Sequence, residues 1–409
     1  MALFPLSFPS AAQEQAPQVS SLAALKKEFE EFAEWLKLGA LPTWSTHGID
    51  GNDTFCESLS SDGATTCSSG LRRMHVQAEQ IVAFATAGAL GWTSDWKQLV
   101  APVLTRLRTS YIKANGAVRA LVDKEWNPVD ESERVADQAF LLLALAALKR
   151  ANFNDPNLEI DAWRLRQRLL SCALPNGTFK EHGAYPFQSN AHMYLLEAAL
   201  AWENLSLDPG WANLADQVAN LAMDLFIDEE TGSIREFFDE SWAPAQGSAG
   251  SLVTPHHQFE WAWLLERHSN LRGDMRGAWI ARRLYAAGRE GVRYDPPAVV
   301  DALNNDFSVR SPNSRLGSQA SWLKATLVMC ENVSEAECEA LIGEAALALQ
   351  ALALHLTENG RWHCQRTACG ERIDAPAPAT SLRNLISVFD QMSQSLAFLC
   401  ARSEPSPLG

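Results

Sequence analysis

Two adjacent histidines stand before an apolar stretch in the segment TPHHQFEWAW, residues 254–263. An imidazole exchanges a proton near pH 6.5, which makes His257 a candidate acid or base at neutral pH. Glu260 follows three residues later, where a helix would place a carboxylate able to orient an imidazole or hold a substrate hydroxyl. The alternative is a structural role in the first turn of a core helix. No second histidine follows at the spacing of a zinc motif, so we expect no metal here.

Other polar residues stand equally early in segments that are otherwise apolar. They are His192 in SNAHMYLLEAALAW, Asp137 and Gln138 in RVADQAFLLLALAAL, and Arg383 and Asn384 in PATSLRNLISVF. If these helix starts meet at one end of a barrel, the polar groups converge on one pocket with apolar walls. For each of them, a structural hydrogen bond is the alternative.

Two further residue types could contact a ligand. Trp261 suits the apolar face of a sugar, although a tryptophan in such a segment is by default a core residue. Arg72 and Arg73 lead the segment RRMHVQAEQIVAFATAG, and basic residues at a helix start are unfavourable for the helix dipole. That position favours a ligand role for one of the two arginines.

Helical periodicity runs through most of the chain and indicates the elements that must position these residues. Apolar residues recur at helical spacing over 21–38, 74–90, 95–114, 133–150, 161–172, 190–204, 211–226, 256–269, 273–290, 319–330, 335–356 and 380–401. Short β-like pieces separate pairs of these helices, as expected when each hairpin stacks on its neighbours. We predict an all-α fold, an (α/α)6 barrel with short β-hairpin loops at one end. An open helical solenoid is the alternative. We expect residues 1–20 to be a disordered lead-in and residues 21–409 to form one barrel domain.

Composition limits the class of ligand. The formal net charge of −15 argues against nucleic acid or an anionic membrane surface as partner, so the ligand is expected to be small. The sequence has no apolar run long enough to span a bilayer and no typical secretory signal, which predicts a cytoplasmic protein. In that compartment the eight cysteines are expected to be reduced. Phosphate loops, nucleophile elbows and dinucleotide fingerprints are absent, so no cofactor is expected.

Six segments resemble, in order, the N-acylglucosamine 2-epimerase superfamily, which includes mannose isomerases and cellobiose 2-epimerases. The segments are RRMHVQAEQIVAFATAGALGW, ADQAFLLLALAAL, SNAHMYLLEAALAWENL, IREFFDESWAPAQG, TPHHQFEWAWLL and RLGSQASWLKA. The resemblance extends over nearly the whole chain from about residue 25. It implies an (α/α)6 barrel whose pocket opens a sugar ring and moves the C2 proton through a cis-enediolate, without a metal or nucleotide.

The resemblance also assigns roles to individual residues. It implies that His257 is an acid/base, that Glu260 supports it, that His192 is a pocket histidine and that Arg73 lies near the sugar oxygens. The physical logic agrees, because proton abstraction beside a carbonyl needs a base near neutral pKa and donors for the developing charge.

Several positions depart from the family pattern. A Tyr-His pair with a second catalytic histidine is common in the family where this chain has Arg383 and Asn384. His363, in RWHCQR, is a candidate to replace it as ring-opening acid. The other departures are Glu79, Gln138, Gly317 and Ser321, where the family often has Arg, His, Trp and Glu.

Losing one histidine favours one reaction of the family over another. Epimerisation at C2 commonly needs a second base on the opposite face, whereas aldose–ketose isomerisation can use one base. We therefore expect an isomerase acting on a mannose- or glucose-like aldose. A sugar-binding protein with a degenerate site is the main alternative. Another activity of such barrels, a glycosidase or a lyase, is the remaining alternative. A glycosidase would need a second carboxylate beside Glu260, for which Asp137 is the candidate. A homodimer is one assembly to consider.

Overall fold

The computed structural model describes residues 21–51, 54–60 and 70–403. The predicted lead-in, residues 1–20, lies outside this range. Within the described residues, no helix is both long enough and apolar enough to cross a membrane.

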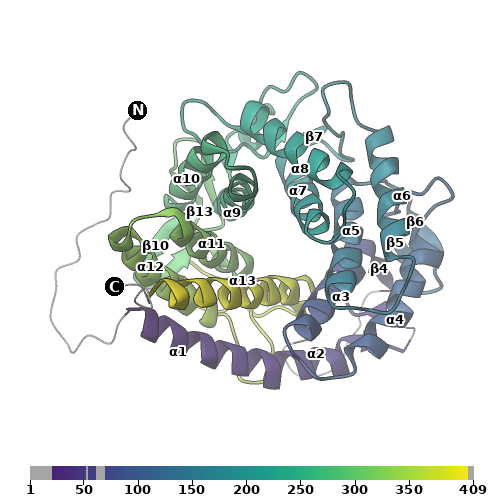
Figure 1. The fold of residues 1–409 in the computed structure, drawn as a ribbon, viewed down its shortest axis with the longest axis horizontal. Coiled ribbons are helices and arrows are strands. Elements are labelled where there is room, and N and C mark those ends of the chain that lie inside the picture. The colour runs from purple at the N-terminus through teal and green to yellow at the C-terminus, as the bar shows by residue number, and fades with distance from the viewer. Residues whose placement is uncertain (1–20, 52–53, 61–69, 404–409) are drawn as a thin grey trace.

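Inner helices form a closed ring around the centre of the molecule (Figure 1). In chain order they are α3 (Met74–Ala89), α5 (Val135–Arg150), α7 (Ser189–Glu203), α9 (Pro255–Arg272), α11 (Leu316–Met329) and α13 (Thr380–Ser403). Each packs on the next, and α13 packs on α3. The closure excludes the open solenoid and confirms the predicted (α/α)6 barrel.

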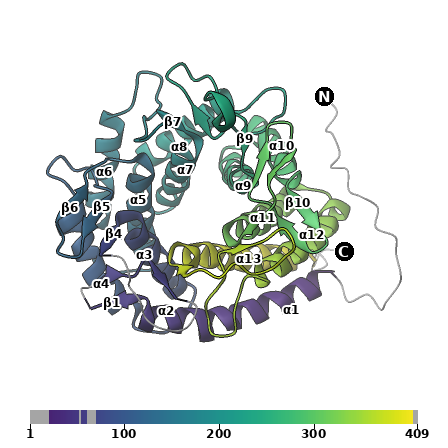
Figure 2. The same ribbon diagram turned by 180° about the vertical axis from the view of Figure 1, so that it is seen from behind.

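Outer helices lie outside this ring, and each connects two consecutive inner helices along the chain or precedes the first (Figure 2). They are α1 (Ser21–Glu34) with the π-helical turn η1 (Trp35–Ala40) and α2 (Leu41–His47), α4 (Trp96–Arg106) with η2 (Leu107–Tyr111), α6 (Leu158–Ser171), α8 (Gly210–Leu221) with η3 (Ala222–Phe226), α10 (Met275–Arg289) and α12 (Glu335–Ala353). Apolar side chains between the two layers form one continuous core. Burial of these side chains is the main stabilising contribution to such a fold.

The two ends of the barrel differ in their connections. Inner helices lead to outer helices through short segments such as 273–274, whereas outer helices lead to inner ones through long segments such as 227–254. The strands lie in the long segments. They are β1 (Ile49–Asp50), β2 (Thr54–Phe55), β3 (Ser58–Leu59), β4 (Leu71–Arg73), β5 (Leu121–Asp123), β6 (Pro128–Asp130), β7 (Phe187–Gln188), β8 (Phe237–Phe238), β9 (Leu252–Val253), β10 (Val292–Tyr294), β11 (Pro297–Val299), β12 (Ala302–Asn304), β13 (Val309–Ser311), β14 (Ser314–Arg315), β15 (Gln365–Arg366) and β16 (Ala377–Pro378). The short 3-10 helix η4 (Gly247–Ala249) also lies in a long segment, and η5 (Cys330–Asn332) follows α11. They pair antiparallel in small sheets, which confirms the predicted hairpins at one end.

A repeated contact joins the inner helices to these long segments. Gln77, Gln138, Gln258 and Gln319 each occupy the fourth residue of an inner helix, and each is buried. Their side-chain amides accept from the N–H and donate to the C=O of one residue in the preceding segment. The residues held in this way are Phe55, Val118, Ile234 and Val299. Because the clamp satisfies two buried backbone groups at once, it fixes each helix start against its own long segment.

The expectation of reduced cysteines is wrong at one position. Cys56 is disulfide-bonded, to a partner outside the described residues. Six other cysteines are free. The expectation relied on the absence of a typical signal sequence, which is an argument about compartment and not about which thiols approach each other in the fold.

Candidate active site

His257 occupies the third residue of α9, and its imidazole is held by a carboxylate from another segment. Nδ1 of His257 lies 2.7 Å from Oε2 of Glu236, which is buried directly before β8. Burial would lower the pKa of His257, but the charge and hydrogen bond of Glu236 outweigh burial and raise it. If the imidazole is neutral, Glu236 accepts the proton of Nδ1, so Nε2 has the free lone pair of a base.

Glu260 lies one turn further along α9 and has different partners from those expected. Its Oε1 accepts from Oγ of Ser321 at 2.6 Å, and Lys324 donates to its Oε2 at 2.9 Å. Burial raises the pKa of Glu260, but Lys324 dominates and lowers it to about 2. Oγ of Ser321 also lies 2.6 Å from Nδ1 of His256. Glu260 therefore belongs to the hydrogen-bond network of His256, and the direct partner of His257 is Glu236.

A second histidine–carboxylate group lies on α3. Nδ1 of His75 is 3.3 Å from Oδ1 of Asp137, the third residue of α5. Burial lowers the pKa of His75, but Asp137 and Glu79 raise it overall. Glu79 is buried one turn along α3, and burial raises its pKa to about 7 despite the positive charge of Arg383. Perturbed acids of this kind are concentrated in functional sites.

Arg383 of α13 is a buried cation that interacts with the carboxylates of other inner helices. It forms an ion pair with Glu197 of α7, and its guanidinium lies over the rings of Phe140 and Tyr194, with centroid distances of 5.4 and 5.8 Å. Burial lowers its pKa, but Glu197 and Glu79 raise it overall, so it stays charged. Asn384 follows on α13, next to Gly317 of α11.

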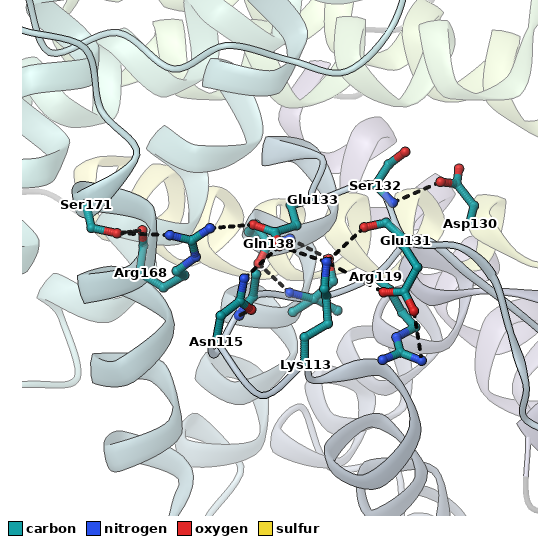
Figure 3. Close-up of polar contacts among 12 residues, drawn as sticks. Lys113, Asn115, Arg119, Asp130, Glu131, Ser132, Glu133, Gln138, Arg168 and Ser171 are labelled. Atoms are coloured by element: carbon teal, nitrogen blue, oxygen red, sulfur yellow. Dashed lines mark hydrogen bonds and ion pairs between the residues drawn. The ribbon is translucent and has the colours of Figure 1, made fainter.

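Gln138 and His192 occupy the fourth residue of their helices, and their polar atoms bind the backbone. The amide of Gln138 holds Val118, close to the ion pairs that Lys113 and Arg168 make with Glu133 (Figure 3). The ring of His192 accepts from the N–H of Phe179 through Nε2 and contacts the Gln188 carbonyl through Nδ1. Burial lowers the pKa of His192 to about 4. The geometry favours a structural role for both residues.

Three other residues that the sequence predicted to bind substrate make no hydrogen bond or ion pair with the two histidine–carboxylate pairs. Trp261 is completely buried, in edge contact with Phe226. The Arg73 side chain is 54% exposed and bound to Glu57 at 2.6 Å. His363 is half-buried on the segment before β15, and its backbone is bonded to His355.

Four arginines at or beside the starts of α3, α11 and α13 do not form a free cationic cluster. Each has its own carboxylate, so none is an unpaired phosphate ligand. The pairs are Arg72 with Asp50, Arg73 with Glu57, Arg315 with Asp301 and Arg383 with Glu197. In the described part of the chain, no group of three or more His, Cys, Asp or Glu residues is arranged to hold a metal ion.

A cavity of about 380 Å³ lies inside the ring, beyond the histidine-bearing helix starts. Its walls come mostly from the later turns of the inner helices, including Thr86, Arg150 and Arg267. Glu197, Trp263 and Arg383 also line it. The ion pair of Arg383 with Glu197 therefore borders this cavity as well as the polar groups near the helix starts.

Comparison with known proteins identifies the family. The family model for N-acylglucosamine 2-epimerase (GlcNAc 2-epimerase) matches residues 54–383. The chain belongs to the N-acylglucosamine 2-epimerase family. It is 38% identical over 378 residues to the "Mannose-6-phosphate isomerase" of Rhizobium meliloti (strain 1021), covering 90% of this chain and 97% of that protein.

Solved structures with the same fold include two sugar-converting enzymes. A cellobiose 2-epimerase from Spirochaeta thermophila DSM 6192 superposes with a TM-score of 0.81 at 18% identity, covering 93% of this chain and 100% of that chain. A D-mannose isomerase superposes with a TM-score of 0.77 at 16% identity, covering 93% and 100%. At these identities the likeness shows the fold alone. The chain is thus a barrel of a family of sugar epimerases and isomerases.

Sequence reasoning did not single out His75, Glu236 and Lys324, which the barrel brings close to the candidate residues. It named Ser321 only as a departure from the family pattern, and it did not foresee the contact of Ser321 with His256. One signal was available, because His75 and Glu79 repeat on α3 the four-residue spacing of His256 and Glu260 on α9. That spacing places both members on one helical face.

Proposed function

We propose that this member of the N-acylglucosamine 2-epimerase family is an aldose–ketose isomerase acting on a mannose-like sugar. The observation that carries the proposal is the hydrogen bond between His257 and Glu236 at the helix starts of the barrel. A buried carboxylate that fixes the tautomer of an imidazole and raises its pKa is a typical arrangement for a general base.

In the proposed reaction His257 removes the proton from C2 of the open-chain aldose. Electrons of the C–H bond form the C1–C2 double bond of an enediolate, and the former carbonyl oxygen O1 becomes negative. His257 returns a proton to C1, and the hydroxyl proton moves from O2 to O1, which gives the ketose. Arg383 would help to stabilise the negative charge that develops on these oxygens.

Isomerisation is favoured over 2-epimerisation because of the group on α13. Asn384 is an amide and cannot exchange a proton at neutral pH. The name of the Rhizobium meliloti relative makes mannose 6-phosphate one substrate to test beside mannose. The arginines at the helix starts are each engaged by a carboxylate, so the geometry does not choose between the free and the phosphorylated sugar.

The test is proton NMR of the protein in heavy water with mannose, glucose, fructose, N-acetylmannosamine and mannose 6-phosphate. Ketose formation with deuterium at C1 or C2 supports the proposal. Inversion at C2 would show an epimerase with a second base. Sugar binding without exchange on any of these compounds would identify a sugar-binding protein instead.

A further inference from the structure

His256 occupies the second residue of α9 and lies beside the proposed base. The ring centroids of His256 and His257 are 5.1 Å apart. The two imidazoles have separate partners, since His257 is bonded to Glu236 and His256 to Ser321. A substrate that contacts one ring is therefore close to the other. Each ring can exchange a different proton of the substrate.

The partners of His256 fix its tautomer. Glu260 is held ionised by Lys324, so it accepts the single hydroxyl proton of Ser321 across 2.6 Å. Oγ of Ser321 also lies 3.0 Å from the carbonyl oxygen of Gly317, which can only accept. With its proton directed to either of these oxygens, Oγ acts as acceptor toward Nδ1 of His256, also at 2.6 Å. In the neutral ring the proton is thus on Nδ1, and Nε2 has a lone pair that can accept from a sugar hydroxyl.

The surroundings of His256 keep the ring neutral. Burial lowers its pKa to about 3, assisted by the charges of His257 and Lys324 and opposed by Glu260. A neutral imidazole beside a separate base is a known arrangement for enolisation, in which the imidazole acts on the oxygens and not on the carbon. His257, with its raised pKa, is suited to the carbon proton.

The absence of a side chain at Gly317 leaves room for the Asn384 amide close to the His256 ring. A Cβ at residue 317 would lie 3.2 Å from Nδ2 of Asn384 and 3.7 Å from Cε1 of His256. Glycine therefore leaves the amide and the imidazole on either side of one small gap. Asn384 offers hydrogen bonds but cannot accept a proton, so the imidazole is the acid–base group of the two.

We infer that His256 is a second catalytic residue, which moves the hydroxyl proton between O2 and O1 while His257 moves the carbon proton. This inference rests on the proposed isomerase function. Nε2 of His256 takes the proton from O2, the O2 electron pair forms the carbonyl at C2, and the same proton passes to the negative O1. The charge of Glu260, relayed through Ser321, stabilises the transient imidazolium. Nothing is oxidised, and the ring ends in its starting state.

The experiment follows both products of the shared enediolate in heavy water. An enediolate that returns to aldose gives the C2-deuterated starting sugar, and one that goes forward gives ketose. Wild type, His256→Gln and Ser321→Ala are compared by NMR, with His47→Gln on the exposed end of α2 as the control. We expect His256→Gln to lower ketose formation by about 100-fold, the usual worth of a proton-transfer group. The ratio of C2-deuterated aldose to ketose should rise.

Ser321 acts as a positioning residue, and its variant should shift the ratio in the same direction by a smaller amount. It also serves as the test if His256→Gln does not fold. General damage to the site slows both products equally, so an unchanged ratio in both variants would overturn the inference and leave the isomerase proposal intact. If wild type forms no ketose from any sugar, the isomerase proposal and this inference fail together.

Discussion

Glu236 and His257 are 21 residues apart in the chain, yet their side chains meet at 2.7 Å. Glu236 comes from the segment before β8 and His257 from the first turn of α9. The neighbouring residue Gln258 holds the backbone of Ile234, which is two residues before Glu236. The clamp therefore holds the carboxylate and the imidazole in register.

Replacing His257 tests the proposed base. We expect His257→Gln to lower kcat by about 10²–10⁴-fold, because glutamine cannot exchange the C2 proton. The melting temperature should change little, since Glu236 can still accept from the new amide. Steady-state rates and thermal unfolding check this. A variant within about threefold of wild-type kcat would exclude His257 as the base.

Replacing Glu236 by glutamine should change the pH profile. The charge of Glu236 raises the pKa of His257, so Glu236→Gln should lower it. A base must be neutral to act, and the acid limb of kcat/KM should therefore move to lower pH, with a smaller maximal rate. The measurement is kcat/KM from pH 4.5 to 9. A limb that moves to higher pH, or does not move, would contradict this assignment.

Glu79 should reduce stability at neutral and alkaline pH. Its pKa is about 7 in the fold and about 4.5 when exposed, so the folded state binds the extra proton between these values. The contribution of Glu79 to the unfolding free energy is therefore fully present below about pH 4.5. It is lost as the pH rises to about 7, which lowers the unfolding free energy by about 3 kcal/mol. Glu79→Gln removes this loss. Its unfolding free energy, relative to wild type, should rise between pH 4.5 and 8 in urea titrations. An offset equal at both pH values would refute the raised pKa.

The structural role of Gln138 separates stability from binding. Gln138→Ala leaves the N–H and C=O of Val118 without their partner and should cost about 2–4 kcal/mol of unfolding free energy. The folded fraction should keep its KM. Gln258→Ala, which breaks the same clamp on α9, is the matched variant for the size of the stability loss. A tenfold rise in KM without loss of stability would instead show that Gln138 binds substrate.

Local sequence patterns predicted the helices, because apolar periodicity is decided within each segment. Closure of the ring depends on contacts between distant helices such as α13 and α3, and the periodicity alone is equally compatible with an open solenoid. The start of α9 is also a local feature, since Thr254 is the N-cap and Pro255 the first helical residue. The partner of each histidine could not be predicted in this way. Glu260 is three residues from His257 and four from His256, and both spacings are compatible with contact on a helix. Ser321 and Lys324 of α11 decide between them, and that decision depends on how two distant helices pack.

The fourth-residue clamp has a consequence for how this family can diversify. On α9 the clamp uses the fourth residue, whereas the proposed reactive groups His256 and His257 use the second and third. Reactive groups can therefore be exchanged without disturbing the attachment that orients them. On α13 the fourth residue is Arg383, which forms an ion pair with Glu197 instead of holding the backbone of a preceding segment. At this helix start an ion pair that borders the cavity replaces the amide clamp, which makes this seam a natural place to engineer a new sugar preference.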